Sequence, residues 1–434
     1  MRRTRFPHPR RLNRAKILQA ILQRAREPSD RGAWLNDNDT FDHGRKLADP
    51  EAVRRARVLL EILPLSRQRR RNWEQKQKDI EILCANLLAN KSKHLIALKP
   101  LAVSLARRSY SPSRYTQASY FVIELINSLH QDGLIGIEKG YRYEKEAKMT
   151  RIWPTRKFFE HFTPFDKIDF QPLELVNLRD IDGRDTEYKD TPETKRIRDV
   201  LRKANIVNRR AQVQLKTSKG FYRLNTDLYA VFNGSFEHGG RLYTGKGGYQ
   251  LLTKEERPLI FIDNRPTVEL DFSGLQPRLL YALEGIQYNG DPYTVVSDYP
   301  ELRPFLKQLL LALLNSDSQT KAVASGNQAL HLDHDLYRAV NAISHRTAEL
   351  MERFKKAHPA IAHHFCQRVG LKLMRLDARI ALEVVESFTS RDLPILSIHD
   401  SFIVQRDKEG ELREVMQAAY RKHTGGFTCP IKNG

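Results

Sequence analysis

Two aspartates lie in sequence contexts typical of divalent-cation ligands. Asp271 ends the stretch Thr267–Asp271, whose alternating side chains predict a β-strand, and the Ser-Gly pair that follows predicts a tight turn into a helix near Leu275. Asp400 follows His399 between two apolar stretches, which predict a hairpin with this pair at its tip. Carboxylates from two strands of one sheet suit the two Mg²⁺ ions of phosphoryl transfer. Either aspartate alone is more typical of a turn or a cap, so the prediction depends on the pair.

A stripe of residues along one predicted helix could bind a nucleotide. Within 301–316, Arg303, Lys307, Leu311 and Asn315 recur every four positions and therefore share one helix face. Two cations one turn apart, followed by an apolar and an amide side chain, would suit a triphosphate and its base. An ordinary amphipathic helix with surface cations is the simpler interpretation of the same pattern.

Further basic segments could contact a nucleic-acid backbone. In Glu237-His-Gly-Gly-Arg241, two glycines let the main chain approach a partner while the arginine reaches a phosphate or a base edge, although a plain hairpin explains the same pattern. Residues 191–215 predict a basic helix with a threonine cap. By contrast, His363 and His364 are adjacent and would not share a helix face, so we do not expect them to bind a metal.

Residues 95–157 have the element order of a winged helix. Helices are predicted near 97–108 and 116–131, and strands over 134–143 and 148–153. The start of the recognition helix would direct three arginines toward DNA: Arg107, Arg108 and Arg114. The hairpin would form a wing with four lysines and arginines: Lys139, Arg142, Lys145 and Lys148. A winged-helix module that binds protein is the alternative, and the charge of the chain favours DNA.

The charge of the chain indicates its class of partner. The sequence has 434 residues, 40% of them hydrophobic, and a formal net charge of +21. Such a length and composition predict a globular protein of two to four domains. The positive charge favours nucleic acid as the partner. A basic protein of the membrane surface is the competing interpretation, but no apolar run approaches the length of a membrane span.

The cysteines and the N-terminal segment indicate in which cellular compartment the protein is expected. Cys84, Cys366 and Cys429 are odd in number, far apart and without metal-binding spacing, which predicts a reduced, cytoplasmic protein. Met1–Arg14 is rich in arginine and has no acidic residue. A transit peptide would fit this composition, but two prolines interrupt the segment, which favours a basic arm that contacts phosphates.

The order of these motifs resembles the palm and fingers of family A nucleic-acid polymerases, which include repair-type DNA polymerases and phage-type single-subunit RNA polymerases. Asp271-Phe-Ser-Gly-Leu-Gln-Pro-Arg278 resembles the first catalytic motif, and Ile398-His-Asp-Ser-Phe402 resembles the second in the form typical of the RNA polymerases. Arg303-x-x-x-Lys307 is similar to the nucleotide-binding helix of the fingers. Glu237–Arg241 is similar to the element that contacts the template–product duplex. The resemblance spans roughly residues 220–410.

The resemblance implies roles at the reacting atoms. Asp271 and Asp400 would bind two Mg²⁺ ions. Arg303 and Lys307 would bind the triphosphate of the incoming nucleotide, and Lys307 would be the candidate general acid for the pyrophosphate leaving group. The partners implied are a DNA template–primer duplex and nucleoside triphosphates.

The resemblance also implies contacts around the primer end. His399 would lie near the primer terminus, and Arg241 and Arg278 would lie near the duplex. Gln276 occupies the position at which DNA polymerases usually have the glutamate that blocks a 2′-hydroxyl, so exclusion of ribonucleotides would be looser.

This sequence departs from the family on the nucleotide helix. The usual Tyr-Gly pair is replaced by Asn315-Ser316, and Leu311 replaces an aromatic residue, so base stacking would be weaker. The leading hypothesis is nevertheless a template-directed nucleotidyltransferase that forms DNA or RNA, with a primase-like role among the options. A DNA-binding replication initiator or regulator with an inactive polymerase-like domain is the main alternative, and a two-metal nuclease is a third.

The expected fold class is α+β. It comprises a right-hand palm and fingers with an antiparallel sheet, after a helical and winged-helix region. The expected domains are a basic helical region (1–94), a winged-helix DNA-binding domain (95–157), a linker with a thumb-like helix (158–220), and the palm and fingers (221–434). Within the last, residues 407–434 predict a helix and a short tail.

Overall fold

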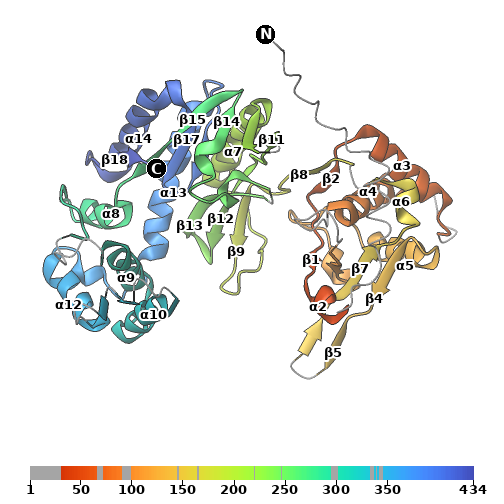
Figure 1. Cartoon of the computed structure of the whole chain (residues 1–434), viewed down its shortest axis with the longest axis horizontal. Helices are drawn as coiled ribbons and strands as arrows, with labels where there is room; N and C mark the ends of the chain where they lie inside the picture. The colour runs from red at the N-terminus through yellow and green to blue at the C-terminus, as the bar shows by residue number, and fades with distance from the viewer. Residues whose placement is uncertain are drawn as a thin grey trace, which may run out of the picture. The chain divides into compact units, whose positions relative to one another are not determined.

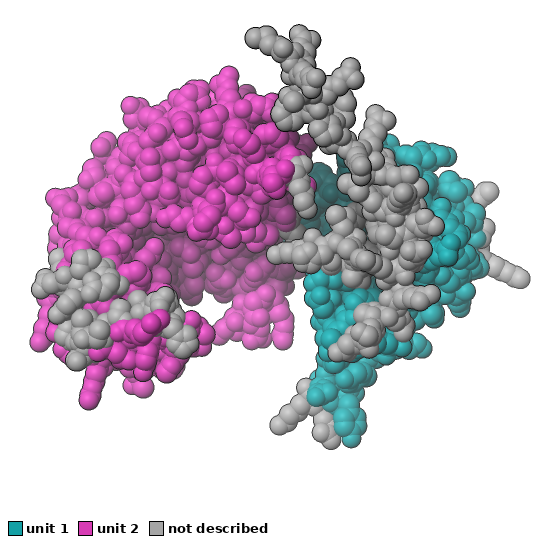
Figure 2. Space-filling view, viewed as in Figure 1, with its two compact units in different colours: residues 1–173 teal, residues 174–434 magenta. Residues whose placement is uncertain are grey.

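The chain forms two compact units, Met1–Leu173 and Glu174–Gly434 (Figure 2). The computed structural model describes residues 31–65, 72–89, 99–143, 146–163, 166–218, 220–245, 247–294, 302–332, 337–338, 340–341 and 346–434. The N-terminal segment Met1–Arg14 and the wing residue Lys145 lie outside these ranges. The division between the units falls inside the predicted linker segment 158–220.

The first unit combines short sheets with helices around its own apolar core (Figure 1). Its helices are α2 (Arg31–Asn36), α3 (Pro50–Ile62), α4 (Trp73–Ala89), α5 (Phe121–Gln131) and α6 (Phe158–His161), with the 3₁₀ turn η1 (Arg107–Tyr110). One sheet has the strand order β1 (Asp39–Thr40), β3 (Leu101–Val103), β7 (Thr150–Pro154), β4 (Ile135–Glu138). Two strand pairs complete the unit: β2 (Arg45–Leu47) with β8 (Ile168–Phe170), and β5 (Tyr141–Tyr143) with β6 (Glu146–Lys148).

The part of this unit between α4 and β7 has the expected strands but not the expected first helix. A helix over 97–108 is wrong, because Leu101–Val103 is a buried strand that pairs antiparallel with β7. Pro100 has no N–H to donate to a helix and directly precedes this strand. Consequently the three arginines assigned to the start of a recognition helix precede α5, which begins only at Phe121 and contains no lysine or arginine.

The second unit is built on a larger, mostly antiparallel sheet. Its strand order is β11 (Gly220–Arg223), β10 (Val213–Thr217), β14 (Ile260–Ile262), β15 (Arg265–Phe272), β17 (Ser401–Gln405), β16 (Leu396–Ile398), and β18 (Ile431–Asn433) also pairs with β15. A second sheet has the order β13 (Ser235–Thr244), β12 (Leu228–Asn233), β9 (Val176–Arg179). The expected α+β class with antiparallel sheets is therefore present.

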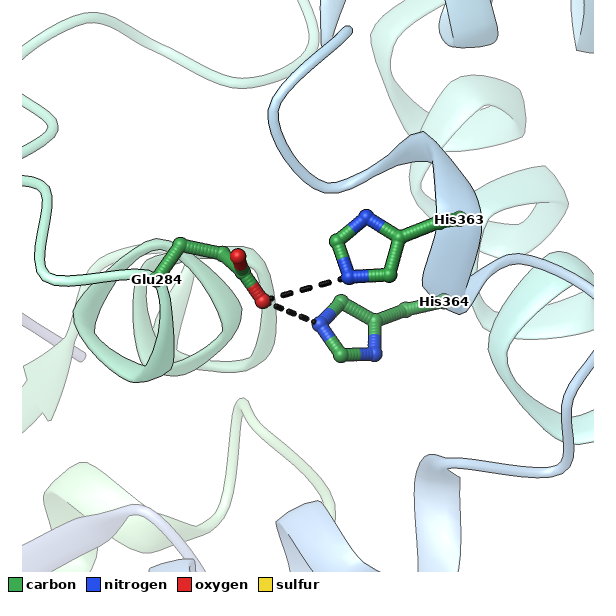
Figure 3. A group of neighbouring side chains, drawn as sticks. All are labelled: Glu284, His363 and His364. Carbon is green, nitrogen blue, oxygen red and sulfur yellow. Dashed lines mark hydrogen bonds and ion pairs between the residues drawn. The ribbon is translucent and has the colours of Figure 1, made fainter.

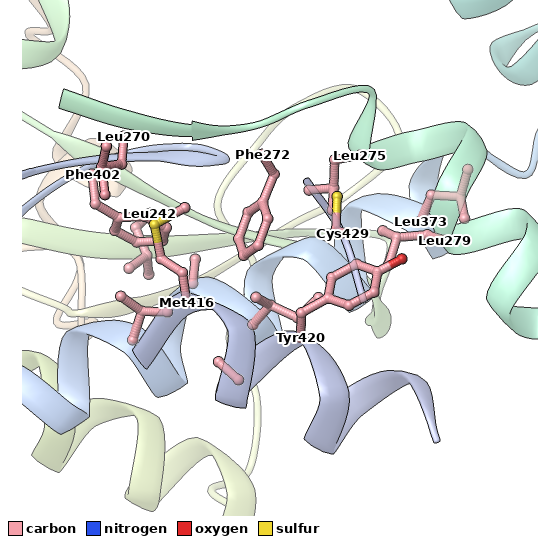
Figure 4. Packing of buried hydrophobic residues seen from close by; sticks show 14 of the residues in the cluster. Leu242, Leu270, Phe272, Leu275, Leu279, Leu373, Phe402, Met416, Tyr420 and Cys429 are labelled. Atoms are coloured by element: carbon pink, nitrogen blue, oxygen red, sulfur yellow. The ribbon is translucent and has the colours of Figure 1, made fainter. Parts of the chain in front are cut away.

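Six long helices accompany these sheets in the described part of the unit. They are α7 (Pro192–Arg210), α9 (Arg303–Asn315), α10 (Gln319–Leu332), α12 (Thr347–Ala357), α13 (Gly370–Thr389) and α14 (Glu409–Thr424), with the shorter α8 (Leu275–Leu283) directly after β15. Helix α13 packs along β13 and α14, whereas α9, α10 and α12 pack together as a separate helical group (Figure 1). Figure 4 shows Phe272 and Phe402 of the sheet meeting Met416 and Tyr420 of α14.

The local predictions around the two aspartates are confirmed. The chain runs from β15 through a turn into α8, and β16 and β17 form a hairpin around His399 and Asp400. Helix α7 starts at a threonine cap, with the side-chain oxygen of Thr191 accepting from the N–H of Thr194 at 3.2 Å. Strand β18 was not expected, because the sequence of the tail predicted no strand. Among the described residues, no helix combines the length and apolar character needed to cross a bilayer.

Candidate active site

The larger sheet of the second unit brings the two predicted aspartates to one of its ends. Asp271 lies opposite Ser401 in the β15–β17 ladder, so it is next to the turn that contains Asp400. The N–H of Phe272 donates to the carbonyl of Asp400 at 3.3 Å, which fixes the hairpin tip against the end of β15. On the other side of β15, Lys432 lies opposite Asp271 in the pairing with β18.

Two left-handed backbone positions shape this end of the sheet. Gly274 has φ of 61° and starts α8 immediately after β15, and a Cβ there would lie 3.2 Å from Pro292. His399 has φ of 58° at the hairpin tip, a conformation that non-glycine residues adopt at a cost of about 1 kcal/mol. The tight turns keep both aspartates at the sheet end, where a substrate can approach.

The electrostatics of Asp271 indicate a site suited to a cation. Burial, and then the neighbouring carboxylate of Asp400, raises the pKa of Asp271 to about 6, while Lys432 and Lys307 oppose this shift. The Nζ of Lys432 lies 3.3 Å from Oδ2 of Asp271. Two carboxylates in electrostatic contact supply oxygen donors and negative charge of the kind that Mg²⁺ requires, and the Lys432 ammonium neutralises part of that charge.

Helix α9 presents its predicted stripe to solvent. Lys307 is exposed, and its positive charge opposes the rise in the pKa of Asp271, one member of the acidic pair Asp271 and Asp400. Arg303 donates to Oδ2 of Asp291 at 3.0 Å, and its guanidinium lies 4.9 Å from the centre of the Tyr293 ring. Of the two cations in the stripe, Lys307 is therefore the one whose charge acts on Asp271.

The other two residues of the stripe, Leu311 and Asn315, offer no aromatic ring on which a base could stack. Leu311 is 37% exposed, and the amide of Asn315 donates to the Leu311 carbonyl at 2.8 Å. Gln276, at the start of α8, has a buried Oε1 with no hydrogen-bond partner among the described residues. A buried acceptor without a partner costs about 1–3 kcal/mol, so a ligand hydroxyl at this position would be stabilised.

Arg241 forms a pair with an acid that the sequence reasoning missed. Its Nε and Nη2 lie 3.0 and 2.9 Å from Oδ2 of Asp377 on α13. Burial raises the pKa of Asp377 to about 6, Arg241 opposes this shift, and Asp400 adds to it. Asp377 is therefore a third carboxylate in electrostatic contact with the site. Its position on the apolar face of α13, three residues before Ile380, was the available signal.

Arg278 differs from its predicted position beside a duplex. Arg278 as a whole residue is 5% exposed, and its guanidinium donates to the carbonyls of Ser273, Tyr288 and Gly290. These three bonds fasten the turn after β15 to the loop before Pro292. Arg278 therefore holds the turn between β15 and α8 in place.

His399 lies between the acidic pair and β13. Burial and the nearby charge of Arg241 lower its pKa, and Asp400 opposes this shift. Its ring centre is 5.7 Å from that of Tyr243, at an interplanar angle of 71°. Its Nδ1 is buried without a hydrogen-bond partner in the described part of the chain, so a neutral His399 retains one nitrogen for a ligand.

Comparison with known proteins gives no family assignment. No protein-family model matches the chain, and no curated protein matches it. Among solved structures, the POL domain of Pol1 from M. smegmatis, in complex with DNA primer-template and dNTP, is similar at 14% sequence identity with a TM-score of 0.28. The matched region covers 56% of this chain and 51% of that chain, about half of each. A similarity of this size assigns neither fold nor function, so the proposal below depends on the residues themselves.

Proposed function

We propose that this protein is a template-directed nucleotidyltransferase that joins nucleoside monophosphate units to a 3′-hydroxyl and releases pyrophosphate. The observation that supports it most directly is the electrostatic coupling of three side chains from three separate elements. Asp271 ends β15, Asp400 occupies a hairpin tip and Lys307 projects from α9, and the charges of the last two act on the carboxyl of the first.

The acidic pair fits the two Mg²⁺ ions that this chemistry uses. Asp271 and Asp400 would hold them, with carboxylate oxygens as the preferred donors. When bound, the ions would activate the attacking oxygen and neutralise charge on the leaving phosphate. The Nζ of Lys432 lies 3.3 Å from Oδ2 of Asp271 and would move aside when an ion binds this carboxylate.

The remaining side chains would position the substrates. Lys307 would bind the phosphates and donate a proton to the departing pyrophosphate. Arg241, held by Asp377, would direct its remaining N–H groups toward the duplex. The unpartnered Oε1 of Gln276 would accept a hydrogen bond from a sugar hydroxyl, so ribonucleotides are expected to be tolerated.

Primer extension with Mg²⁺ tests this proposal. A primed single-stranded template is incubated with dNTPs or with rNTPs, alongside an unprimed template. Asp400→Asn is expected to lower extension by at least about a hundredfold, because one of the two metal-binding carboxylates is lost. Asp407→Asn is the matched control, since Asp407 is exposed and paired with Arg265 at 3.4 Å. Product in the unprimed reaction would make the activity primase-like.

An inactive polymerase-like domain in a DNA-binding initiator is the second candidate. It is favoured by Arg303, whose guanidinium is engaged by Asp291 and Tyr293, and by Leu311 where a stacking residue would be expected. A folded protein that binds DNA but yields no product with any nucleotide would support this candidate. Extension that is lost in Asp400→Asn would exclude it.

The first unit is proposed to bind duplex DNA as a winged helix through its wing. The order α4, β3, η1, α5, β4, hairpin, β7 suits this motif, and β3, β7 and β4 form one sheet. The β5–β6 hairpin exposes Tyr141 by 47% and Tyr143 by 72% on one face, where Lys148 lies opposite Tyr141, and the exposed Arg142 points to the other face. Exposed aromatic rings beside a cation favour a nucleic-acid contact over a protein-binding role.

Salt-dependent DNA binding tests the wing. Arg142→Ala is expected to weaken binding and to reduce the slope of log K against log salt by about 1, because one phosphate contact is lost. Arg54→Ala is the control, since Arg54 is paired with Glu51 on α3 at 2.6 Å. An unchanged slope for Arg142→Ala, together with a reduced slope for Arg114→Ala, would move the contact to the loop before α5.

A further inference from the structure

Three side chains with metal-binding atoms meet outside the acidic pair. Figure 3 shows Glu284 facing His363 and His364. Oε1 of Glu284 lies 3.2 Å from Nε2 of His363 and 2.8 Å from Nε2 of His364. One ligand atom from each of the three residues lies within 4.8 Å of the others. The group joins parts of the chain about 80 residues apart, so the fold and not the local sequence assembles it.

The two histidines converge because they do not lie in an α-helix. They end the 3₁₀ turn η5 (Ala362–His364), and their ring centres are 4.1 Å apart with an interplanar angle of 37°. The expectation that adjacent histidines would point apart is wrong, because it assumed α-helical geometry. Both Nε2 atoms face the same carboxylate oxygen, an arrangement that presents two imidazole donors and one carboxylate donor to one point.

The donor set indicates which cation would bind. Two imidazole nitrogens and one carboxylate oxygen suit Zn²⁺ and are not the all-oxygen set that Mg²⁺ and Ca²⁺ prefer. Bonds of about 2.0–2.1 Å in a tetrahedral site place neighbouring ligand atoms roughly 3.3 Å apart. The observed separations of 2.8 and 3.2 Å from Glu284 are close to this spacing, so small side-chain movements would suffice.

The backbone on both sides of the group is already fixed. Glu284 caps the C-terminal end of α8, and its N–H donates to the Leu280 carbonyl at 3.1 Å. One turn earlier, the Tyr281 hydroxyl bonds Nδ1 of His358 at 2.9 Å, and Nε2 of His358 bonds the Pro292 carbonyl at 2.8 Å. The end of α8 and the segment that contains the histidines are therefore joined independently of any metal, which lowers the entropy lost on binding.

We propose that Glu284, His363 and His364 form a Zn²⁺ site that is separate from the acidic pair. Water completes the coordination, since His363 is 59% exposed at its side chain and leaves the site open to solvent. The metal cross-links the end of α8, which directly follows the catalytic strand, to the segment that leads into α13. Because α13 contains Asp377, the site stabilises the framework of the active centre without contacting substrate.

Zinc titration of the metal-free full chain tests this site. Calorimetry in excess Mg²⁺, which occupies the acidic pair, is expected to show one Zn²⁺ per chain. Glu284→Gln and His364→Ala are each expected to weaken zinc binding at least about tenfold, because one of three protein ligands is lost. His331→Ala is the matched control, since His331 is an exposed histidine on α10 that stacks on Tyr337. Asp400→Asn should bind zinc as the unsubstituted chain does.

The melting temperature separates loss of the site from loss of the fold. Zinc is expected to raise the melting temperature of the unsubstituted chain and of His331→Ala, but not of Glu284→Gln. In the absence of zinc, Glu284→Gln should melt close to the unsubstituted chain, because its carboxylate is partly exposed. Unchanged zinc affinity in Glu284→Gln and His364→Ala, no zinc binding at all, or loss of binding only in Asp400→Asn would each overturn the proposal. None of these outcomes depends on polymerase activity.

Discussion

At the scale of single residues, the acids of the second unit differ in what neutralises them. Asp377 is 3% exposed at its side chain and is neutralised by Arg241. Glu269 is bonded by Arg257 at 2.9 Å and by the Ser401 hydroxyl at 2.7 Å. A two-metal nuclease would require additional carboxylates that are free to bind its metals. Asp377 and Glu269 instead form ion pairs with Arg241 and Arg257. The pairing therefore favours a transferase over the two-metal nuclease.

The Arg241–Asp377 pair should be important for stability. Arg241→Met leaves a buried carboxylate without its cation and is expected to lower the free energy of unfolding by roughly 3 kcal/mol, the low end for a buried pair because Arg241 keeps some exposure. Adding Asp377→Asn should recover part of that loss, because the uncompensated charge is removed. Urea unfolding monitored in the second unit would measure both effects.

An exposed ion pair supplies the reference for this prediction. Arg202 and Asp199 lie 2.5 Å apart on α7 with side chains 58% and 70% exposed, so Arg202→Met should cost less than about 1 kcal/mol. Equal losses for Arg202→Met and Arg241→Met would contradict the assignment of a buried pair.

At the scale of elements, the sequence predicted the helices, strands and turns that depend on neighbouring residues along the chain. The strand–turn–helix at Asp271 and the hairpin at Asp400 follow from side-chain alternation and turn residues within about fifteen positions. Strand β18 could not be predicted in this way, because it exists only through pairing with β15, more than 150 residues earlier. The pairing of Asp377 with Arg241 could not be predicted either, because it also joins residues distant in the sequence. It depends on α13 packing along β13. Prediction therefore succeeded for the local structure around Asp271 and Asp400 and missed the elements that surround it.

The contact between α8 and the segment after α12 should respond to pH through His358. His358 is fully buried, and burial lowers its pKa below 6.5. Its neutral form satisfies both ring nitrogens, since Nε2–H donates to Pro292 and Nδ1 accepts from Tyr281, whose own pKa is raised to about 12 by burial. The unfolded chain takes up a proton at higher pH than the folded chain does. This contribution to stability is therefore present above pH about 6.5 and is lost as pH falls through the lowered pKa.

Unfolding at two pH values measures this contribution. The free energy of unfolding of the second unit should fall between pH 7.5 and pH 5.5, and His358→Gln should show a flatter dependence because glutamine does not titrate in this range. His331→Gln, at an exposed histidine, should retain the slope of the unsubstituted chain. Identical slopes for all three proteins would show that His358 is not the responsible group.

At the scale of the whole molecule, the chain separates a unit with the β5–β6 hairpin from a unit with the candidate active site. Each has its own continuous apolar core, one including Leu83 and Leu125 and the other Leu270 and Phe402. Two independent cores imply two domains that fold separately, and the proposed functions divide in the same way. Extension would belong to Glu174–Gly434, and much of the non-catalytic DNA affinity to Met1–Leu173.

Separate expression of Glu174–Gly434 tests this division. The fragment is expected to unfold cooperatively and to extend a primer at saturating DNA with a kcat within about threefold of the full chain, since every proposed catalytic side chain lies within it. Its KM for primed template should rise by roughly tenfold or more, with a shallower salt dependence, because phosphate contacts of the first unit are absent. The Asp400→Asn fragment is the control for activity. A folded fragment with unchanged KM would remove the first unit from template binding, whereas a folded fragment with no activity would show that the first unit contributes to the chemistry itself.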